Sequence, residues 1–384
     1  MPTTRVKNAL YRIMLPLLAP HCSASPVSSV SGHAIRDMES FVRIIRKRHV
    51  LGSSTLIESG PDWSLICTSS DLPAHAAQTD TVYRVASITK TATAILTMRL
   101  ADLHLLDPDS PVSDFFTSEA AKTSLNGITL RHLLSHTSGL VDPPGLETAL
   151  ENGIPFPELL QNVRLFSPGD TFHYSNLGFG LIGCVMESIL HCPVGVIFRN
   201  YLFSPLNMNA TLEGCLLPRE TIMPVTRILP YRKGSDLVIT KLGSVPLTSE
   251  DPLRHYGHTA GSMYTDIFSL RKLFHVLTNK DVSFLSGAAV NQMKREHASY
   301  GPVSPSLSYG LGLLRINDPS ISEHCIYGHQ GFAYGCVDGA FWEEDTGSML
   351  ITLNGGCCEA RSGRLGISNR DFMRWAFRKE LPLW

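Results

Sequence analysis

The chain has 384 residues, of which 43% are hydrophobic and 17% charged, a composition typical of a globular protein with a large core. Its net charge of −1 argues against nucleic acid or an anionic membrane as the main partner, because both select for a basic surface. No uninterrupted apolar run reaches the roughly 18 residues that cross a bilayer, so we expect no transmembrane segment. By length, the chain holds about two domains, or one domain with a large insertion.

Residues 1–30 are predicted to form an N-terminal extension. Arg5 and Lys7 precede a short apolar segment at 13–19, an order that a weak secretory signal also has. The apolar run is at the short limit for such a signal, and Arg12 adjoins it. We therefore favour an extension, with a cleaved signal as the alternative.

The cysteines predict reduced thiols. They number nine, an odd count, and contain no Cys-x-x-Cys pair, which argues against a disulfide framework or a zinc site. Reduced thiols favour a cytoplasmic protein, with secretion as the alternative. Cys357 and Cys358 are adjacent, and we expect two thiols in a late apolar segment rather than a strained redox disulfide.

The N-terminal part is predicted to contain a helix and then two strands. Apolar residues recur at helical spacing between 34 and 48. Segments 50–57 and 62–68 have the composition of strands and are joined by the turn Gly60-Pro61-Asp62. A further helix is predicted to open at Ser87.

The middle of the chain is predicted to be helical. Residues 128–140 have the pattern of a helix that is capped by threonine and stopped by Gly139. From 141 to 255, short helical stretches alternate with connections rich in proline and glycine. A helix is expected at 265–276.

The C-terminal part returns to strands, expected at 309–313, 332–342 and 348–353, before a final helix around 372–377. Early strands, a helical middle and late strands predict an α/β fold in which the first and last segments pair in one sheet.

We expect the boundaries of these regions as follows. Residues 31–384 would form the catalytic domain, with a sheet region at 31–110 and 255–384 and a helical region at 111–254.

Ser87 and Lys90 are the first candidate catalytic residues. They are three positions apart, so on a helix their side chains share one face. At a helix N-terminus, free N–H groups and the helix dipole favour a developing oxyanion beside Ser87. In a dry site Lys90 loses its charge and can act as a base on the serine hydroxyl.

The same spacing occurs at Ser269 and Lys272, where Arg271 favours a solvated surface. A single Ser-x-x-Lys match is therefore weak, and its meaning depends on companions elsewhere in the chain.

Tyr174 and Asn176 are the second candidate element. An acyl-transfer site needs a polar group that relays the proton and an amide that holds the substrate. Tyr174-Ser175-Asn176 supplies both, just before an apolar helical segment at 179–189. Beside a cationic Lys90 the tyrosine can favour phenolate. The structural alternative is an aromatic turn residue that packs on a helix.

The third element is Gly328-His329-Gln330-Gly331-Phe332, predicted on a late strand. Here the backbone N–H of Phe332 can complete an oxyanion hole, with His329 facing the pocket. Similar short segments at 241–243 and 255–257 precede the 265–276 helix and are less suited to flank the nucleophile.

His132 and His136 have the spacing of a metal-binding pair on a helix. No glutamate follows His132, and no third ligand is evident, so a structural role is the stronger prediction.

Together these motifs resemble the β-lactamase and penicillin-binding protein family. The chain is similar to the class C-type branch, which has Tyr-x-Asn as its middle motif and includes class C β-lactamases, DD-peptidases, β-lactamase-fold esterases and fungal transacylases. The resemblance covers roughly residues 30–384. It rests on the Ser87 segment, on 130–140, on Pro168-Gly169 with Tyr174-Ser175-Asn176, and on Gly328-His329-Gln330-Gly331.

The resemblance implies a mainly antiparallel sheet flanked by helices, with a helical subdomain inserted. By the same resemblance Ser87 is the nucleophile, and Lys90 with Tyr174 is the base pair. Asn176 contacts the substrate amide or the lysine.

The third motif would bind the substrate through His329, Gly331 and Phe332, and the N–H groups of Ser87 and Phe332 would form the oxyanion hole. This chain has His-Gln-Gly where the family has Lys-Thr-Gly. The family's lysine pairs with the carboxylate of a β-lactam, and a neutral histidine does so weakly.

The sequence therefore predicts a serine esterase or acyltransferase that acts on a small, largely apolar ester or thioester, including one bound to a carrier, as in secondary metabolism. The alternatives are a D-amino-acid peptidase or β-lactamase, and a non-catalytic binding protein. No metal or organic cofactor is implied, because side chains activate the nucleophile.

Overall fold

A computed structural model describes residues 37–378 apart from 71, 73, 147–155, 161–162, 229–231, 234–256 and 279–282. It also describes residues 26–31 and a few positions before them. The segments at 241–243 and 255–256, which resemble the third motif, lie outside the described residues, as does most of the predicted extension.

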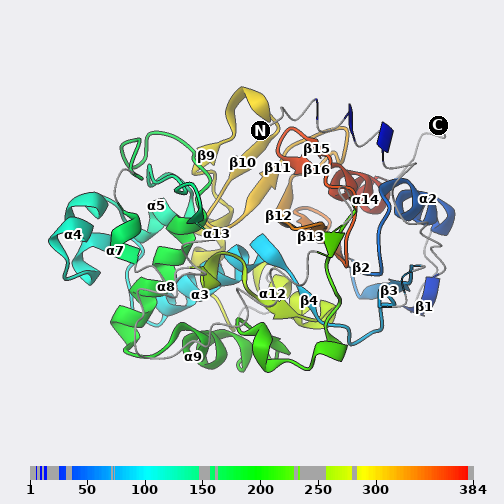
Figure 1. Cartoon of the computed structure of the whole chain (residues 1–384), viewed down its shortest axis with the longest axis horizontal. Helices are drawn as coiled ribbons and strands as arrows, with labels where there is room; N and C mark the ends of the chain where they lie inside the picture. The colour runs from blue at the N-terminus through cyan, green and yellow to red at the C-terminus, as the bar shows by residue number, and fades with distance from the viewer. Residues whose placement is uncertain are drawn as a thin grey trace.

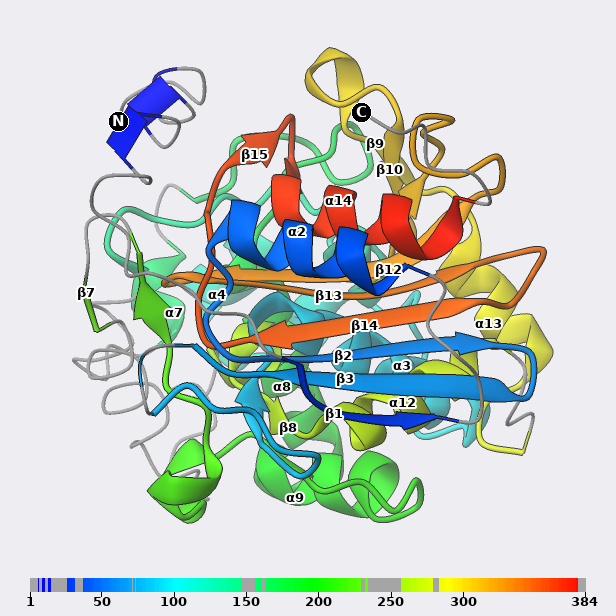
Figure 2. The same ribbon diagram turned by 90° about the vertical axis from the view of Figure 1, so that its right-hand side faces the viewer.

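A nine-stranded sheet runs through the protein (Figure 2), in the order β1-β3-β2-β14-β13-β12-β11-β10-β9. Every neighbouring pair is antiparallel. The strands are β1 (Pro26–Ser31), β2 (Ser53–Ser59), β3 (Asp62–Thr68), β9 (Ala298–Ser299), β10 (Leu307–Tyr309), β11 (Leu314–Ile316), β12 (Ile326–Ala333), β13 (Cys336–Glu343) and β14 (Met349–Asn354).

The pairing of β2 with β14 joins the two ends of the chain in one sheet, with Ile57 opposite Leu350. This confirms the predicted α/β fold with a mainly antiparallel sheet. The outermost strand, β1, begins at Pro26, inside the segment 1–30 predicted as an extension. The sheet therefore begins before residue 31. The proposed limits of the sheet and helical regions stay a prediction.

Two helices cover one face of the sheet, α2 (Met38–Arg48) and α14 (Ile367–Phe377), as Figure 2 shows. The ring of Phe41 lies 5.0 Å from that of Trp375, and the Trp375 indole N–H donates to the carbonyl of Asp37 at 2.9 Å. A layer of buried apolar side chains thus seals the sheet on the side away from the candidate site.

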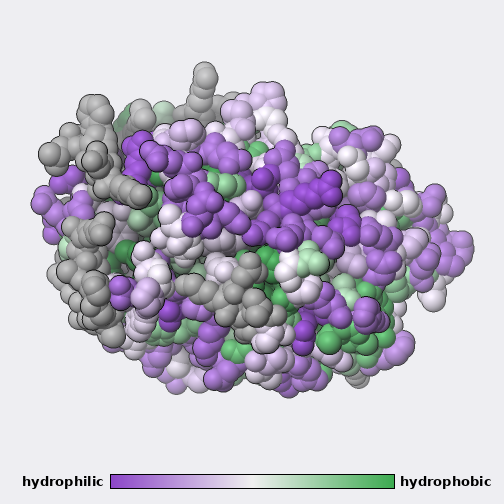
Figure 3. Space-filling view, turned by 180° about the vertical axis from the view of Figure 1, so that it is seen from behind, coloured by the Kyte–Doolittle hydropathy of each residue, from purple (hydrophilic) through white to green (hydrophobic). Residues whose placement is uncertain are grey.

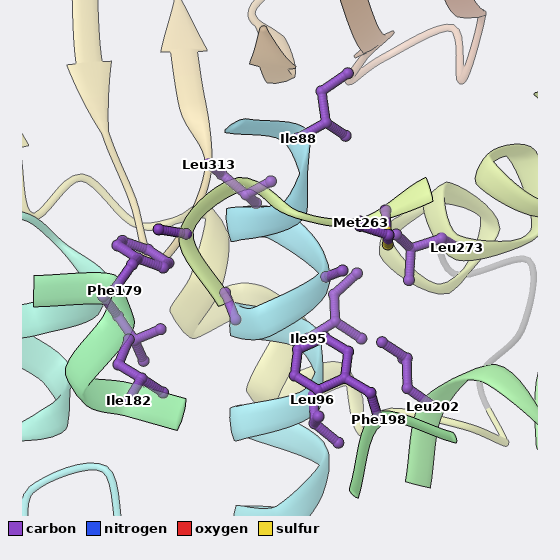
Figure 4. Close-up of a cluster of buried hydrophobic side chains, with 14 of the residues drawn as sticks. Ile88, Ile95, Leu96, Phe179, Ile182, Phe198, Leu202, Met263, Leu273 and Leu313 are labelled. Atoms are coloured by element: carbon purple, nitrogen blue, oxygen red, sulfur yellow. The ribbon is translucent and has the colours of Figure 1, made fainter. Parts of the chain in front are cut away.

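Helix α3 (Thr89–Asp102) forms the centre of the layer on the other face. It is buried nearly all round, and Ile95 and Leu96 lie among side chains from three other segments (Figure 4). These include Phe198 of α9 (Val194–Phe198), Leu202 of the π-helical turn η3 (Arg199–Phe203) and Leu273 of α12 (Ile267–Leu277). Helix α3 is therefore a core helix, although its buried residues include Lys90 and several threonines whose hydroxyls donate to backbone carbonyls.

The inserted helical region lies beside the sheet in Figure 1. Its helices are α4 (Glu119–Leu125), α5 (Leu130–Leu134), α7 (Phe156–Leu159) and α8 (Asn176–Leu190). The chain returns through α11 (His258–Gly261), α12 and α13 (Gly287–Lys294).

Among the described residues, no single helix has the length and apolar character to cross a bilayer. Helix α8 with the segment 194–203 meets these criteria only as a pair bent by 85°.

Short strands complete the fold. A three-stranded sheet contains β4 (Tyr83–Arg84), β8 (Tyr264–Thr265) and β5 (Ala210–Thr211). Two further pairs are β6 (Thr226–Arg227) with β7 (Arg232–Lys233), and β15 (Arg361–Ser362) with β16 (Leu365–Gly366).

On the surface in Figure 3, hydrophilic residues gather across the upper part of the face and apolar residues form smaller patches.

Three predicted elements are wrong in extent. The 128–140 helix ends at Leu134, because the Ser135 hydroxyl donates back to the carbonyl of Arg131 and His136 takes a left-handed φ of 58°. Of the expected strand at 309–313, only Tyr309 is in a strand, as the last residue of β10, and 310–313 connect β10 to β11. The expected strand at 332–342 is interrupted by a turn at 334–335, where both residues have positive φ.

The eight cysteines among the described residues, which exclude Cys22, are not in disulfide bonds. Cys357 and Cys358 are buried, and Sγ of Cys357 lies 3.5 Å from Oγ of Ser368. Burial raises the pKa of the Cys357 thiol well above its usual value. The adjacent pair is therefore present as two buried thiols.

Candidate active site

Ser87 lies in the 3-10 turn η1 (Ala86–Ile88), between strand β4 and helix α3. Ala86 has a φ of 45°, a strained value for a residue with a side chain. Thr89 holds the turn, since its Oγ1 donates to the carbonyl of Ala86 at 2.6 Å and accepts from the N–H of Met263 at 3.1 Å. The turn thus leaves Ser87 partly exposed between buried neighbours.

Lys90 is fully buried one turn further along. Its Nζ lies 3.2 Å from Oγ of Ser87, 2.8 Å from Oδ1 of Asn176 and 2.7 Å from the carbonyl oxygen of Ala260. A neutral amine has two N–H donors and one lone pair. Because the amide and carbonyl oxygens can only accept, they take both donors and leave the lone pair for the Ser87 hydroxyl.

The environment of Lys90 favours this neutral form. Burial lowers its pKa to about 7, with Arg84 adding to the effect and Asp142 opposing it. A lysine with a pKa near neutrality is a competent general base.

Tyr174 lies just before α8, and its phenol is near enough to the Ser87 side chain to interact with it. The Nζ of Lys90 is 4.9 Å from the centre of its ring. Burial raises the pKa of Tyr174 above its usual value, although the interaction with the Ser87 side chain opposes the shift. The expectation that this tyrosine favours phenolate is therefore wrong, since a desolvated phenol keeps its proton.

Strand β12 lies against the turn that carries Ser87. A Cβ on Gly331 would lie 2.5 Å from the carbonyl oxygen of Val85, so glycine permits this close approach. Strand β11 pairs with β12 only as far as Gly328, and the following residues, including Phe332, pair with β13. On Phe332 itself, the guanidinium of Arg361 lies 3.7 Å from the ring centre. An oxyanion role for the Phe332 N–H stays a prediction.

His329 is buried rather than open to the solvent. Its Nε2 lies 2.9 Å from the hydroxyl of Tyr309, and its Nδ1 lies 2.8 Å from the carbonyl oxygen of Gln330. The carbonyl can only accept, so Nδ1 carries the proton and Nε2 accepts from Tyr309. Burial, with the nearby Lys90, lowers the pKa of His329 to about 3, which makes the imidazole neutral at physiological pH.

Comparison with known proteins identifies the family of the chain. A family model described as Beta-lactamase matches residues 69–352. The chain belongs to the β-lactamase family.

The curated proteins that are similar to the chain include an esterase and a hydrolase. Esterase EstB of Burkholderia gladioli is 26% identical over 332 residues, which cover 76% of this chain and 82% of that protein. Unguisins hydrolase ungD' of Aspergillus campestris is 28% identical over 196 residues, 45% of this chain and 36% of that protein.

Two solved structures share the fold. EstCE1, described as a hydrolase with promiscuous acyltransferase activity, has a TM-score of 0.69 at 20% identity, over 90% of this chain and all of that one. A D-stereospecific amidohydrolase from Streptomyces sp. has a TM-score of 0.66 at 23% identity, over 87% of this chain and 96% of that one.

Asp142 is a site residue that sequence reasoning missed. Its carboxylate accepts hydrogen bonds from Nδ2 of Asn176, from Oγ of Ser175 and from the N–H of Leu177, each at 2.9 Å. It therefore holds the start of α8 beside Lys90. No spacing marks this residue in the sequence, because it follows the 130–140 segment as one of many loop aspartates.

The other candidates have structural contacts. Ser269, in the second Ser-x-x-Lys, is buried, and its Oγ accepts from the N–H of Asn209 at 2.8 Å. Lys272 donates to the carbonyl of Asn207. In the capping box of α5, Nδ1 of His132 accepts from the N–H of Thr129 at 3.2 Å. The described residues contain no group of three or more potential metal ligands.

Proposed function

We propose that this chain is a serine hydrolase or acyltransferase that works through a covalent acyl-Ser87 intermediate. The main support is the contact between Nζ of Lys90 and Oγ of Ser87 at 3.2 Å, made by a buried lysine with a pKa of about 7. The nucleophile and a base that loses its charge near neutral pH are thus in hydrogen-bond reach, which is the geometry that nucleophilic catalysis requires.

The reaction begins when Oγ of Ser87 attacks the acyl carbonyl carbon and its proton passes to Nζ of Lys90. The carbonyl oxygen takes the negative charge and binds the N–H groups of Ser87 and Phe332. The bond to the leaving group then breaks, and the leaving oxygen or sulfur takes a proton from the Tyr174 hydroxyl. Lys90 returns its proton to Tyr174, which leaves a neutral acyl-enzyme.

Deacylation repeats these steps in reverse. Water or an acceptor alcohol loses its proton to the Tyr174–Lys90 pair and attacks the acyl carbon, and Ser87 recovers a proton as it leaves. Hydrolysis and acyl transfer use the same residues, and the acceptor decides between them.

The proposed substrate is a small, largely apolar ester or thioester, including a carrier-bound thioester, with a role in secondary metabolism. The similarity to EstB over most of both chains supports an ester. The neutral His329 supports it further, because it offers no cation where the family's lysine binds a carboxylate. We further propose, as the sequence predicts, that Asn176 and Gly331 lie beside the substrate.

A D-amino-acid peptidase is the second candidate. The D-alanyl-D-alanine-carboxypeptidase/endopeptidase AmpH of Escherichia coli is 31% identical over 144 residues, which are 35% of this chain. A D-Ala-D-Ala peptide or a cephalosporin consumed faster than simple esters would favour a peptidase or β-lactamase.

Intact-protein mass spectrometry after brief exposure to acyl donors tests the proposal. The panel contains short nitrophenyl esters, acyl thioesters and a cephalosporin. We expect wild type to gain the acyl mass and Ser87→Ala to gain none. Lys272→Ala, in the second Ser-x-x-Lys, is the matched control and should acylate as wild type does.

Substantial turnover by Ser87→Ala would overturn the assignment of the nucleophile. An absence of adduct and turnover with every donor would favour the third candidate, a non-catalytic binding protein.

A further inference from the structure

His136 holds the backbone on both sides of Tyr174. Its carbonyl accepts from the N–H of His173 at 2.8 Å, and its Nδ1 accepts from the N–H of Ser175 at 3.2 Å. These two N–H groups belong to the residues directly before and after the phenol. One residue, distant in sequence, therefore fixes the peptide that carries the proposed proton relay.

The imidazole also supports the phenol ring. The ring centres of His136 and Tyr174 lie 4.3 Å apart with an interplanar angle of 35°. Phe179 and Tyr309 each lie 4.9 Å from the His136 ring. With aromatic neighbours on several sides, the imidazole has little room to turn, and the phenol rests on a fixed surface.

The hydrogen bond from Ser175 defines the form of the imidazole. Nδ1 can accept only when it carries no proton, so the proton of the neutral ring is on Nε2. Burial, with Lys90 adding to the effect, lowers the pKa of His136 well below its usual value. The ring is thus neutral at physiological pH, and its Nδ1 remains an acceptor for the N–H of Ser175.

The backbone of His136 is itself constrained. Its φ of 58° is in the left-handed region, where a residue other than glycine is strained. Strained residues persist where the surrounding contacts require them, and they concentrate at functional sites. Here the strained conformation places the carbonyl and the ring of one residue against the same tripeptide.

We propose that His136 is a positioning residue for Tyr174, and that its backbone carbonyl, Nδ1 and ring together fix the phenol within reach of Ser87. The proposal rests on the proposed function, in which Tyr174 relays the proton. It assigns to this histidine a role in the rate of acylation rather than in stability alone.

A double-mutant cycle tests the proposal, because two residues that act through one step are not additive. The acylation rate is measured with a nitrophenyl ester for wild type, His136→Ala, Tyr174→Phe and the double variant. Each rate is divided by the concentration of active sites found by titration. We expect His136→Ala to slow acylation at least tenfold, with KM changed less than threefold. In the Tyr174→Phe background, His136→Ala should slow acylation less than threefold.

Two further variants separate the contacts and allow for poor folding of the alanine variant. His136→Asn retains an acceptor for the Ser175 N–H and tolerates a left-handed φ, so it should recover part of the rate. His136→Phe keeps a ring without the acceptor and should be slower than His136→Asn. The matched control is His132→Phe, which removes a similar acceptor four residues away and should lower stability without changing the acylation rate.

Equal losses from His136→Ala in both backgrounds, or a wild-type rate in His136→Phe, would overturn the positioning role. If Tyr174→Phe itself reacts like wild type, the relay in the proposed function fails instead, so the two failures are distinguishable.

Discussion

The carboxylate of Asp142 fixes which way the amide of Asn176 faces. Because the carboxylate accepts from Nδ2 at 2.9 Å, Oδ1 is the atom presented to Nζ of Lys90, at 2.8 Å. A flipped amide would place two donors against the lysine. A loop aspartate thus decides where the protons of the proposed base are directed.

Removing this carboxylate is therefore expected to impair the reaction. Asp142→Asn should lower kcat/KM at least tenfold and destabilise the protein by about 1–3 kcal/mol, the usual effect of leaving buried donors unpaired. The checks are steady-state kinetics and urea unfolding. Asp109→Asn is the control, because that carboxylate pairs with Arg131 at the surface and a change there should alter neither value much. Wild-type kinetics in Asp142→Asn would remove the aspartate from the site.

The pH dependence should follow Lys90. Protonation removes the lone pair that takes the Ser87 proton, so kcat/KM should rise with pH through a midpoint of about 7 and then level off. The attraction of Asp142 raises the pKa of Lys90, and Asp142→Asn should therefore move this midpoint to lower pH. The measurement is kcat/KM between about pH 5 and 9, with circular dichroism to confirm folding. A flat profile would argue against lysine as the base.

Tyr174→Phe should slow acylation by about 10²-fold or more, the usual contribution of a positioned acid or base. The phenyl ring retains the contact with His136, so the melting temperature should change little. Stopped-flow measurement of the acylation burst separates this step from deacylation. Tyr327→Phe is the control. That tyrosine lies near the start of β12 and stacks on Trp342 of β13, so the variant should react like wild type.

Gly331→Ala should separate β12 from the Ser87 turn. The added methyl would lie 2.5 Å from the carbonyl oxygen of Val85 and 3.2 Å from Cβ of Asp338, so backbone must shift. We expect acylation to fall at least tenfold and stability to decrease by about 1–3 kcal/mol, the typical cost of overpacking. At Gly287 a Cβ would meet nothing within 4 Å, so Gly287→Ala should leave both unchanged. An unimpaired Gly331→Ala would show that this close approach is dispensable.

Much of the fold followed from local pattern. The α2 and α14 helices, the β2–β3 hairpin and β14 lie close to their expected positions, because apolar periodicity and turn residues act over a few positions. Elements that depend on distant contacts were misjudged. Helix α5 ends early through the backbone of His136, whose strained conformation is held by residues that follow some forty positions later.

The order and spacing of Ser87, Lys90, Tyr174, Asn176 and the 328–332 strand were sufficient to predict the family and to select the candidate site. The protonation states depended on the tertiary structure. Lys90 reaches Asn176 across 86 residues of chain and Ala260 across 170. Burial and charge–charge interactions arise only when such segments pack together. The sequence thus determined which groups are available. Packing decided their charges, because burial lowers the pKa of Lys90 to about 7, keeps the proton on Tyr174 and leaves His329 neutral.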